Sequence, residues 1–248
     1  MGLARLLPRP NVRAATAASS DTATVIALAN QKGGVAKTTT TLNLGVAFAE
    51  RGLDVLVHKL PITEIVRSGE IDVAVSSIDL AGAELALSSM IGRERALEKA
   101  LLPALESYDW ILIDTPPSLG LLTINAFVAA TGVIVPLQCE YLSLRGLVQL
   151  ENTLSMIREN LNPQVEIQGI LPTMFDRRLL HSREAVDILQ ENFGDLVLNT
   201  RIRKTVRYAE APVKGQSVLR YDPTGEAAAM YRDLAKEVLD GAQTRQHA

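Results

Sequence analysis

The sequence predicts an α/β fold in which a mostly parallel, twisted sheet carries helices on both faces. Short apolar runs alternate along the chain with longer stretches of helical periodicity, which is the pattern of successive strand–helix units. One such run leads through a glycine-bearing turn into a helix that begins with Lys and Thr. The chain of 248 residues, 47% of them hydrophobic, is long enough for one sizeable core.

Six strands and seven helices are expected. The strands are predicted over residues 24–29, 53–58, 71–75, 110–114, 132–136 and 167–172. The helices are predicted over residues 37–51, 79–88, 93–106, 120–129, 144–160, 181–192 and 224–240. Met230, Leu234 and Val238 fall at helical spacing in the last helix, which is therefore expected to pack on the sheet. Residues 22–242 are predicted to form a single domain.

The two ends of the chain differ from this pattern. Arg5, Arg9 and Arg13 precede the first acidic residue, and a run of small residues follows them. Residues 1–21 are predicted to be a disordered tail, and a basic arm that contacts DNA is the second interpretation. Residues 243–248 are predicted to be a short tail without the bulky apolar face of a membrane-binding helix.

The most specific motif follows the first predicted strand and reads Lys32-Gly-Gly-Val-Ala-Lys-Thr-Thr39. Glycine lets the backbone approach phosphate oxygens, and the N–H groups of a helix N-terminus attract an anion. Lys37 is placed to reach the β- and γ-phosphates of a nucleotide, and the Thr38 hydroxyl to bind Mg²⁺. The residues expected to hold the nucleotide are Lys32, Gly33, Gly34, Val35, Ala36, Lys37, Thr38 and Thr39.

This loop departs from the usual pattern G-x-x-x-x-G-K-[ST]. Gln31 and Ala36 stand where the two glycines are expected, and Lys32 adds a second lysine at the head of the loop. One lysine would neutralise the phosphates of its own site. The other would reach a nucleotide across a dimer interface and stabilise negative charge on the γ-phosphate. Lys32 and Lys37 are therefore predicted to be catalytic.

The second part of the site is expected at the end of the strand over residues 110–114. An acid at the carboxyl end of a strand beside such a loop serves the Mg²⁺ shell or holds water. Asp114 is that acid, so it is the third predicted catalytic residue and, with Thr38, the predicted metal site. A further buried strand ends in polar residues near Cys139, at the strand ends where α/β sheets bind ligands.

Composition excludes several classes of protein. The single cysteine rules out an internal disulfide framework and counts against iron–sulfur ATPases. No apolar stretch is long and uninterrupted enough to span a bilayer, so a cytoplasmic protein is expected. The net charge of −3 means that any nucleic-acid site would have to be a local basic patch.

Together these motifs resemble the ParA/Soj family of partition ATPases, within the MinD-like group of P-loop NTPases that have a deviant Walker A loop. The resemblance implies an ATPase that uses Mg²⁺ and forms an ATP sandwich homodimer on nonspecific double-stranded DNA. It implies a ParB/Spo0J-type centromere-binding partner, a nucleoid-associated location and a role in chromosome or plasmid segregation. Besides the loop, the matching blocks are Thr38-Thr-Thr-Thr-Leu-Asn-Leu-Gly45, Ile78-Asp-Leu-Ala-Gly-Ala-Glu-Leu85, Ile113-Asp-Thr-Pro-Pro-Ser-Leu-Gly-Leu-Leu-Thr-Ile-Asn125, Gln138-Cys-Glu-Tyr141 and Val206-Arg-Tyr-Ala-Glu-Ala-Pro212.

Basic residues in the C-terminal third form the predicted DNA surface. Arg178 and Arg207 match positions where the family carries DNA-contacting arginines, and Arg203 and Lys204 lie in the same loop as Arg207. Without an aromatic ladder or a recognition-helix signal, the expected binding is independent of base sequence; a solvated basic loop is the alternative. The resemblance also places Met174 near the adenine, and simple core packing is the alternative for that residue.

The chain departs from the family after the strand over residues 53–58. There the family has an acidic motif, Asp-x-Asp-Pro-Gln-Gly, whose aspartates help to hold Mg²⁺ and orient water. This chain has His58-Lys-Leu-Pro61 instead, and its connection to Ile71 is much shorter. His58 is interpreted as a strand-end residue, and the spacing of Glu64 is wrong for a substitute.

Three explanations of this departure remain open. The protein hydrolyses bound ATP very slowly, or the missing groups come from elsewhere, for instance Asp114 alone with Mg²⁺, or a segment has been lost from the sequence. The first functional hypothesis is therefore a DNA-segregation ATPase. The second is an ATP-binding, hydrolysis-deficient DNA scaffold. A third is a MinD-like membrane regulator, although no membrane partner is expected from the C-terminal tail.

Overall fold

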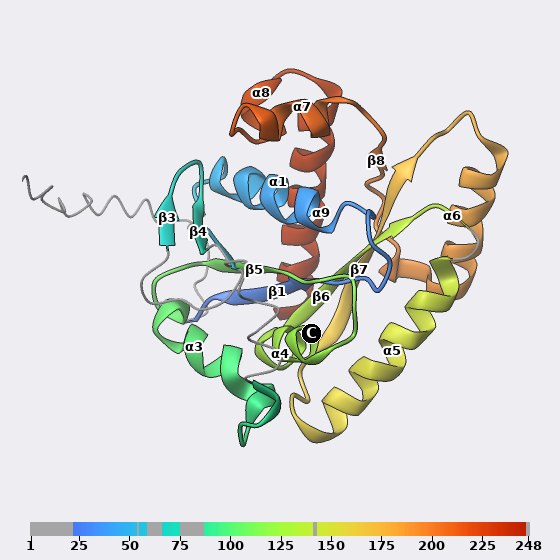
Figure 1. Cartoon of the computed structure of the whole chain (residues 1–248). Helices are drawn as coiled ribbons and strands as arrows, with labels where there is room; N and C mark the ends of the chain where they lie inside the picture. The colour runs from blue at the N-terminus through green and yellow to red at the C-terminus, as the bar shows by residue number, and fades with distance from the viewer. Residues whose placement is uncertain (1–21, 54, 59–65, 75–86, 141–142, 247–248) are drawn as a thin grey trace, which may run out of the picture.

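The structure is a computed structural model, and it describes residues 22–53, 55–58, 66–74, 87–140 and 143–246 (Figure 1). The predicted tail over residues 1–21 lies outside these ranges, as does nearly all of the helix predicted over residues 79–88.

One sheet of eight strands runs through the centre of the molecule, in the order β3-β4-β2-β5-β1-β6-β7-β8 (Figure 1). Neighbouring strands are parallel except β3 and β4, which are antiparallel. The predicted α/β class with a mostly parallel sheet is therefore confirmed. The strands are β1 (Thr24–Leu28), β2 (Val55–His58), β3 (Val66–Ser68), β4 (Asp72–Ala74), β5 (Trp110–Asp114), β6 (Gly132–Gln138), β7 (Glu166–Phe175) and β8 (Ile202–Arg203).

Helices cover both faces of this sheet. The helices α1, α7, α8 and α9 lie on one face, and α3, α4 and α5 lie on the other (Figure 1). Their bounds are α1 (Lys37–Ala49), α3 (Ala96–Leu105), α4 (Leu121–Ala129), α5 (Ser143–Asn160), α6 (Leu180–Phe193), α7 (Arg207–Val213), α8 (Val218–Tyr221) and α9 (Glu226–Gln246), with the 3₁₀ turns η1 (Arg93–Arg95) and η2 (Gly194–Leu196).

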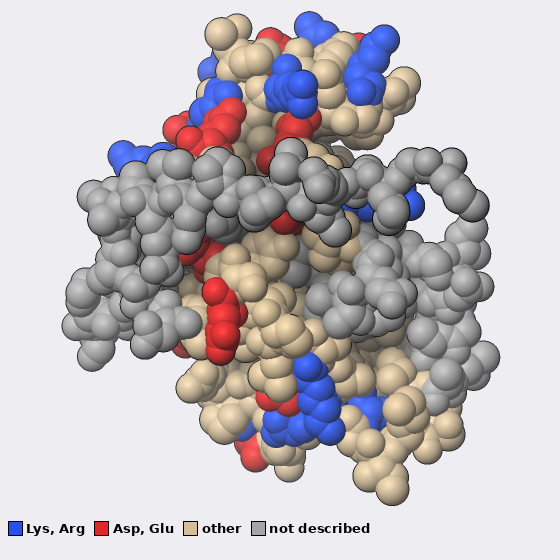
Figure 2. All heavy atoms as spheres, turned by 90° about the vertical axis from the view of Figure 1, so that its left-hand side faces the viewer, with Lys and Arg blue, Asp and Glu red and all other residues tan. Residues whose placement is uncertain are grey.

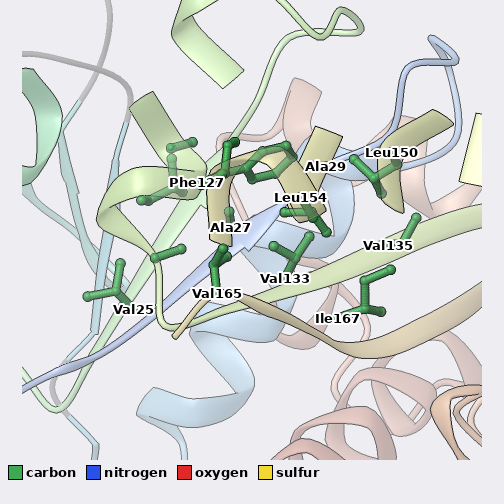
Figure 3. Close-up of a cluster of buried hydrophobic side chains, with 14 of the residues drawn as sticks. Val25, Ala27, Ala29, Phe127, Val133, Val135, Leu150, Leu154, Val165 and Ile167 are labelled. Atoms are coloured by element: carbon green, nitrogen blue, oxygen red, sulfur yellow. The ribbon is translucent and has the colours of Figure 1, made fainter. Parts of the chain in front are cut away.

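The alternation of side chains along β1 divides the interior into two cores. Successive strand residues point to opposite faces, so Val25 and Ala27 pack under α4 and α5, beside Phe127 and Leu154 (Figure 3). Ile26 and Leu28 point the other way. They pack with α1 and α9, where the buried residues include Leu44, Phe48, Tyr231 and Leu234. Because both faces of β1 are buried, the strand is fixed between β5 and β6.

Several elements differ from the sequence expectation. The strands β3 and β8 have three and two residues, too short for a periodic signal, and neither was predicted. The helices α7 and α8 were also missed, because they are short and α7 contains Pro212. The predicted helix over residues 93–106 begins with the turn η1. Helix α9 runs to Gln246, so the predicted domain end at residue 242 falls inside it.

Candidate nucleotide-binding site

The glycine-bearing loop leaves β1 at the carboxyl edge of the sheet and leads into α1. Three side-chain hydrogen bonds tie the loop and the end of β1 to residues of β6, of β7 and of the segment just after β5. Asn30 Nδ2 donates to the carbonyl of Pro136 over 2.8 Å, and Thr173 Oγ1 donates to the carbonyl of Val35 over 3.2 Å. Thr115 Oγ1 donates to the carbonyl of Leu28 over 2.9 Å. Asn30, Thr115 and Thr173 are buried, so these hydrogen bonds hold the loop rigidly before any ligand arrives.

The backbone of the loop is left-handed at two positions. Gly34 has φ 72°, and Ala36, the residue before α1, has φ 67°. A residue with a Cβ is disfavoured in this region by about 1–2 kcal/mol. Ala36 occupies a position where the usual pattern has glycine. The backbone keeps the left-handed conformation there, and the Cβ of alanine makes that conformation strained.

Exchanging alanine and glycine in this loop should change stability in opposite directions. Ala36→Gly should raise the free energy of unfolding by roughly 0.5–1 kcal/mol, because relief of strain exceeds the entropy cost of glycine. Gly34→Ala should lower it by about 1 kcal/mol, since φ is 72° and no atom crowds the new Cβ. Urea unfolding measures both. Gly146→Ala on α5, where a Cβ also meets nothing within 4 Å, is the control and should be neutral or stabilising.

Lys37, the first residue of α1, is buried, with an exposed fraction of 7%. Its Nζ donates to the carbonyl of Lys32 over 3.1 Å, so the ammonium folds back beneath the loop. Burial lowers the pKa of Lys37, and the nearby Asp114 carboxylate partly opposes that shift. A buried ammonium with little solvation is a strong partner for an anion that enters the loop.

Thr38 and Asp114 meet at the floor of the site. In β5, Asp114 lies opposite Leu28 of β1, so the strand register places its carboxylate directly beside the loop. Thr38 Oγ1 donates to Asp114 Oδ2 over 2.6 Å. A hydroxyl and a carboxylate at this distance form a set of oxygen ligands of the kind that Mg²⁺ uses. The structure therefore brings together the two residues predicted for the metal, and they fit such an ion.

Lys32 occupies the rim of the site. Its backbone N–H donates to Asn30 Oδ1 over 2.9 Å, and its Nζ forms a 2.8 Å ion pair with Glu140, just beyond β6. Gln138 Nε2 donates to the other carboxylate oxygen of Glu140 over 2.6 Å. Within a single chain, therefore, the Lys32 ammonium is paired with the Glu140 carboxylate. Glu140 was not among the predicted site residues, although the polar exit of its strand pointed to this edge.

A cavity of about 670 Å³ opens over the loop. Its lining includes residues 33, 34 and 36–39 of the loop, residues 113–117 at and after the end of β5, Leu97, Leu122 and Ala126, Met174, and residues 202–205 and 208–209. Met174 lies at the break in register between β7 and β8 and has φ 53°, a strained conformation for a residue with a side chain. Met174 is one of the residues that line the cavity, and it is only partly buried. The nucleotide-binding role expected for it stays a prediction.

Three further site residues were not predicted. Asn30 and Thr115 hold the loop, and their roles were invisible because their partners are distant in the sequence. Tyr208 lines the cavity and packs edge-on against Tyr231, with ring centroids 5.7 Å apart. Burial raises the pKa of Tyr208, so its hydroxyl stays neutral. Tyr208 falls within a sequence block that resembled the family, which is the only signal that could have drawn attention to it.

Of the four predicted DNA-binding residues, Arg203, Lys204 and Arg207 lie close together, and Arg178 lies apart from them. Arg203 and Lys204 line the same cavity as the phosphate loop. Arg207 begins α7, and Arg178 lies before α6, where it forms a fork with Asp176 at 2.9 and 3.1 Å. Arg178 is 84% exposed. The loop that carries Arg203 and Lys204 therefore connects the cavity to the basic surface.

The end of β2 is where the family's acidic motif was expected. His58 lies opposite Ile113, one residue before Asp114, so the chain leaves β2 at the same edge of the sheet as the site. Residues 59–65, including Glu64, lie outside the described ranges. Among the residues that are described, no cluster of three or more metal-ligating side chains is found.

Comparison with known proteins identifies the family. Residues 23–62 and 53–167 match a family model described as an AAA domain. The chain is 39% identical to the sporulation initiation inhibitor protein Soj of Bacillus subtilis, over 86% of this chain and 97% of that protein. An uncharacterised protein of Mycobacterium tuberculosis is 40% identical over 97% of this chain and 86% of its own length.

A solved structure is also similar to this chain. Cobyrinic acid a,c-diamide synthase from Mycobacterium smegmatis, with bound ADP and magnesium, superposes with a TM-score of 0.75 at 35% identity, covering 89% of this chain and 96% of that one. The chain thus combines a deviant glycine-bearing loop, an aspartate beside it and a mostly parallel sheet with similarity to these proteins over most of its length. The chain belongs to the ParA/Soj family of P-loop ATPases.

Proposed function

We propose that this protein is an ATP-dependent partition ATPase that segregates chromosome or plasmid DNA. The observation that carries the proposal is the joining of Thr38 and Asp114 at 2.6 Å beside the buried ammonium of Lys37, at the floor of a 670 Å³ cavity. The backbone of residues 33–39 would surround the phosphates. Thr38 and Asp114 would hold Mg²⁺, which supplies a positive charge that stabilises the phosphates during transfer.

The remaining residues of the site take distinct roles in this proposal. Lys37 neutralises the phosphates of its own site. Lys32 leaves its ion pair with Glu140 and instead contacts the nucleotide bound to a second subunit, so that ATP bridges a homodimer. The exchange is feasible because both partners of the Lys32–Glu140 pair are about half exposed, and exposed pairs are weak. Met174 and the loop before α7 would contact the base.

Partners and location follow from the family. We propose that the dimer binds double-stranded DNA without sequence preference through Arg178, Arg203, Lys204 and Arg207. A ParB/Spo0J-type partner would stimulate ATP hydrolysis, and the protein would act on the nucleoid in the cytoplasm. Among the helices that the structure describes, none is both long and apolar enough to cross a bilayer.

A hydrolysis-deficient DNA scaffold is the second candidate, and the reason to keep it is the sequence His58-Lys-Leu-Pro61 where the acidic motif was expected. The two segments that match the family model overlap over residues 53–62, in the same part of the chain. The alignment with the M. tuberculosis protein spans 273 positions, more than the 248 residues of this chain, so part of that protein has no counterpart here. Without a residue to orient water, turnover would fall by about 10²–10⁴-fold.

Single-turnover hydrolysis of radiolabelled ATP tests the proposal. The protein, in excess over ATP, is mixed with Mg²⁺ alone, with duplex DNA, and with DNA plus a ParB-type protein. An ATPase switch predicts slow basal hydrolysis that rises at least about tenfold with DNA and partner. Tight ATP binding with no hydrolysis under any condition would instead establish the scaffold. Failure to bind ATP at all would exclude both.

A further inference from the structure

A second, smaller cavity of about 310 Å³ adjoins the nucleotide cavity, and its chemistry is different. It shares three residues with the larger one, Arg203, Lys204 and Thr205. Three cationic side chains therefore converge on one space, because Arg207 also lines it. The remaining lining residues are Asp222, Glu226, Ala227 and Met230. Convergent arginine and lysine side chains are the usual surroundings of a phosphate group.

The two arginines of this cavity are already paired with carboxylates. The Nη1 atom of Arg203 contacts Glu226, at the first turn of α9. Arg207 pairs with Glu210 at 2.9 Å and with Asp222 at 3.6 Å. The Tyr221 hydroxyl donates to the same Glu210 carboxylate over 3.2 Å, which keeps that carboxylate in place. Each guanidinium therefore faces an acid that comes from the chain itself.

Arg178 repeats this arrangement outside the cavity. Its fork to Asp176 holds the pKa of that carboxyl down to about 2. Across the predicted DNA surface, each of the three arginines is thus paired with at least one carboxylate, Arg178 with Asp176, Arg203 with Glu226, and Arg207 with both Glu210 and Asp222. Blue and red side chains are likewise mixed at the upper end of the face in Figure 2, where Figure 1 places α7 and α8.

Such pairing weakens attraction to DNA. Nonspecific affinity comes from cations that neutralise phosphates and release counterions. An arginine that already faces a carboxylate contributes little charge at a distance and must lose that partner when a phosphate binds. The pairs can be displaced, because the Arg203 and Glu226 side chains are 39% and 67% exposed. The carboxylates therefore compete with DNA without blocking it.

We propose that the smaller cavity is a phosphodiester site for double-stranded DNA that is screened by the chain's own carboxylates. Glu226 competes with a backbone phosphate for Arg203, and Glu210 and Asp222 compete with it for Arg207; this competition limits DNA affinity. The inference rests on the proposed function, since that function supplies DNA as the polyanion. It adds that acidic residues of α7, of α9 and of the segment before α9 set the affinity of the DNA surface.

Neutralising one screening carboxylate tests this inference. Glu226→Gln should raise affinity for a fluorescent random-sequence duplex about threefold at low salt, and the slope of log K against log salt should steepen by about one. Fluorescence anisotropy at several salt concentrations, with Mg²⁺ and a non-hydrolysable ATP analogue, measures both. Asp222→Asn should act in the same direction through Arg207 and serves as an independent variant. Melting temperatures confirm that each variant is folded.

Two matched variants separate local screening from a change in overall charge. Glu166→Gln alters the net charge equally, but Glu166 begins β7 and is therefore at the opposite end of that strand from Met174, which lines the nucleotide cavity. It should leave the affinity within the error of the wild type. Adding Arg203→Ala to Glu226→Gln should abolish the gain, because no guanidinium is then released.

Each outcome bears on a different claim. A gain at Glu226 that is absent at Glu166 and that requires Arg203 supports the screened site. Equal gains from Glu226→Gln and Glu166→Gln, or no gain from either screening variant while the wild type binds DNA, overturn the inference and leave the proposed function standing. Absence of DNA binding by the wild type and by every variant overturns both.

Discussion

Lys37→Ala should lower the affinity for ATP by about 10²–10³-fold, because a buried charge-assisted contact contributes roughly 3–4 kcal/mol. Lys37 as a residue is only 7% exposed, and its ammonium donates to the carbonyl of Lys32, so the group is poorly solvated. Removing it leaves phosphate oxygens in a poorly solvated place without a counter-charge. Titration calorimetry with Mg²⁺ and a non-hydrolysable ATP analogue measures the loss.

The fold should tolerate this substitution. Burial lowers the pKa of Lys37, so desolvation of the cation offsets part of what its contacts contribute to stability. The melting temperature without nucleotide should therefore change little. Lys99→Ala, at an exposed position on α3, is the matched control and should leave ATP binding intact. If Lys37→Ala kept wild-type affinity, the assignment of residues 32–39 as the phosphate loop would be wrong.

Asp114→Asn should abolish most of the Mg²⁺ dependence of nucleotide binding and reduce ATP turnover by about 10²–10³-fold. The amide keeps the shape of the side chain and an oxygen that can accept from Thr38, but it loses the charge that attracts the ion. The Asp114 carboxylate also favours the charged form of Lys37, so its loss should lower the pKa of Lys37 further. The substitution should therefore weaken two interactions with the phosphates at once, the one through Mg²⁺ and the one with the Lys37 ammonium.

A magnesium titration separates these two effects. ATP affinity is measured over a range of Mg²⁺ concentrations for the wild type, for Asp114→Asn and for Asp187→Asn, an exposed aspartate on α6 that serves as the control. The control should follow the wild-type curve. The Asp114 variant should show weak binding that barely responds to the ion. A wild-type response to Mg²⁺ in that variant would exclude Asp114 from the metal site.

Much of the site was predictable because its chemistry is contiguous. The seven residues from 33 to 39 form one turn and the start of one helix, so their order in the sequence already specifies their arrangement. Asp114 was predictable for a related reason: an acid at the end of a buried strand can only emerge at the carboxyl edge of the sheet. Both predictions depend on local geometry and on the parallel topology, which the alternation of strands and helices indicated.

The long-range hydrogen bonds that hold the loop in place could not be predicted in this way. Thr173 holds Val35 across 138 positions of sequence, and Asn30 holds Pro136 across 106. Glu140 is paired with Lys32 across 108 positions. A threonine or an asparagine has the same local pattern whether it supports a site or faces solvent. Its role depends on which strands become neighbours, and that is a property of the assembled sheet.

The sequence by itself determined the α/β class, the phosphate loop with its two lysines, and the aspartate beside it, because hydrophobic periodicity and short-range motifs encode local structure directly. Only the tertiary structure decided the charge of the surface next to the site. Arg203 and Arg207 counted as basic residues in the sequence, whereas in the fold Glu226 and Asp222 lie against them. The reason is that the energy of a charge depends on what lies within a few ångströms of it, and packing sets those neighbours.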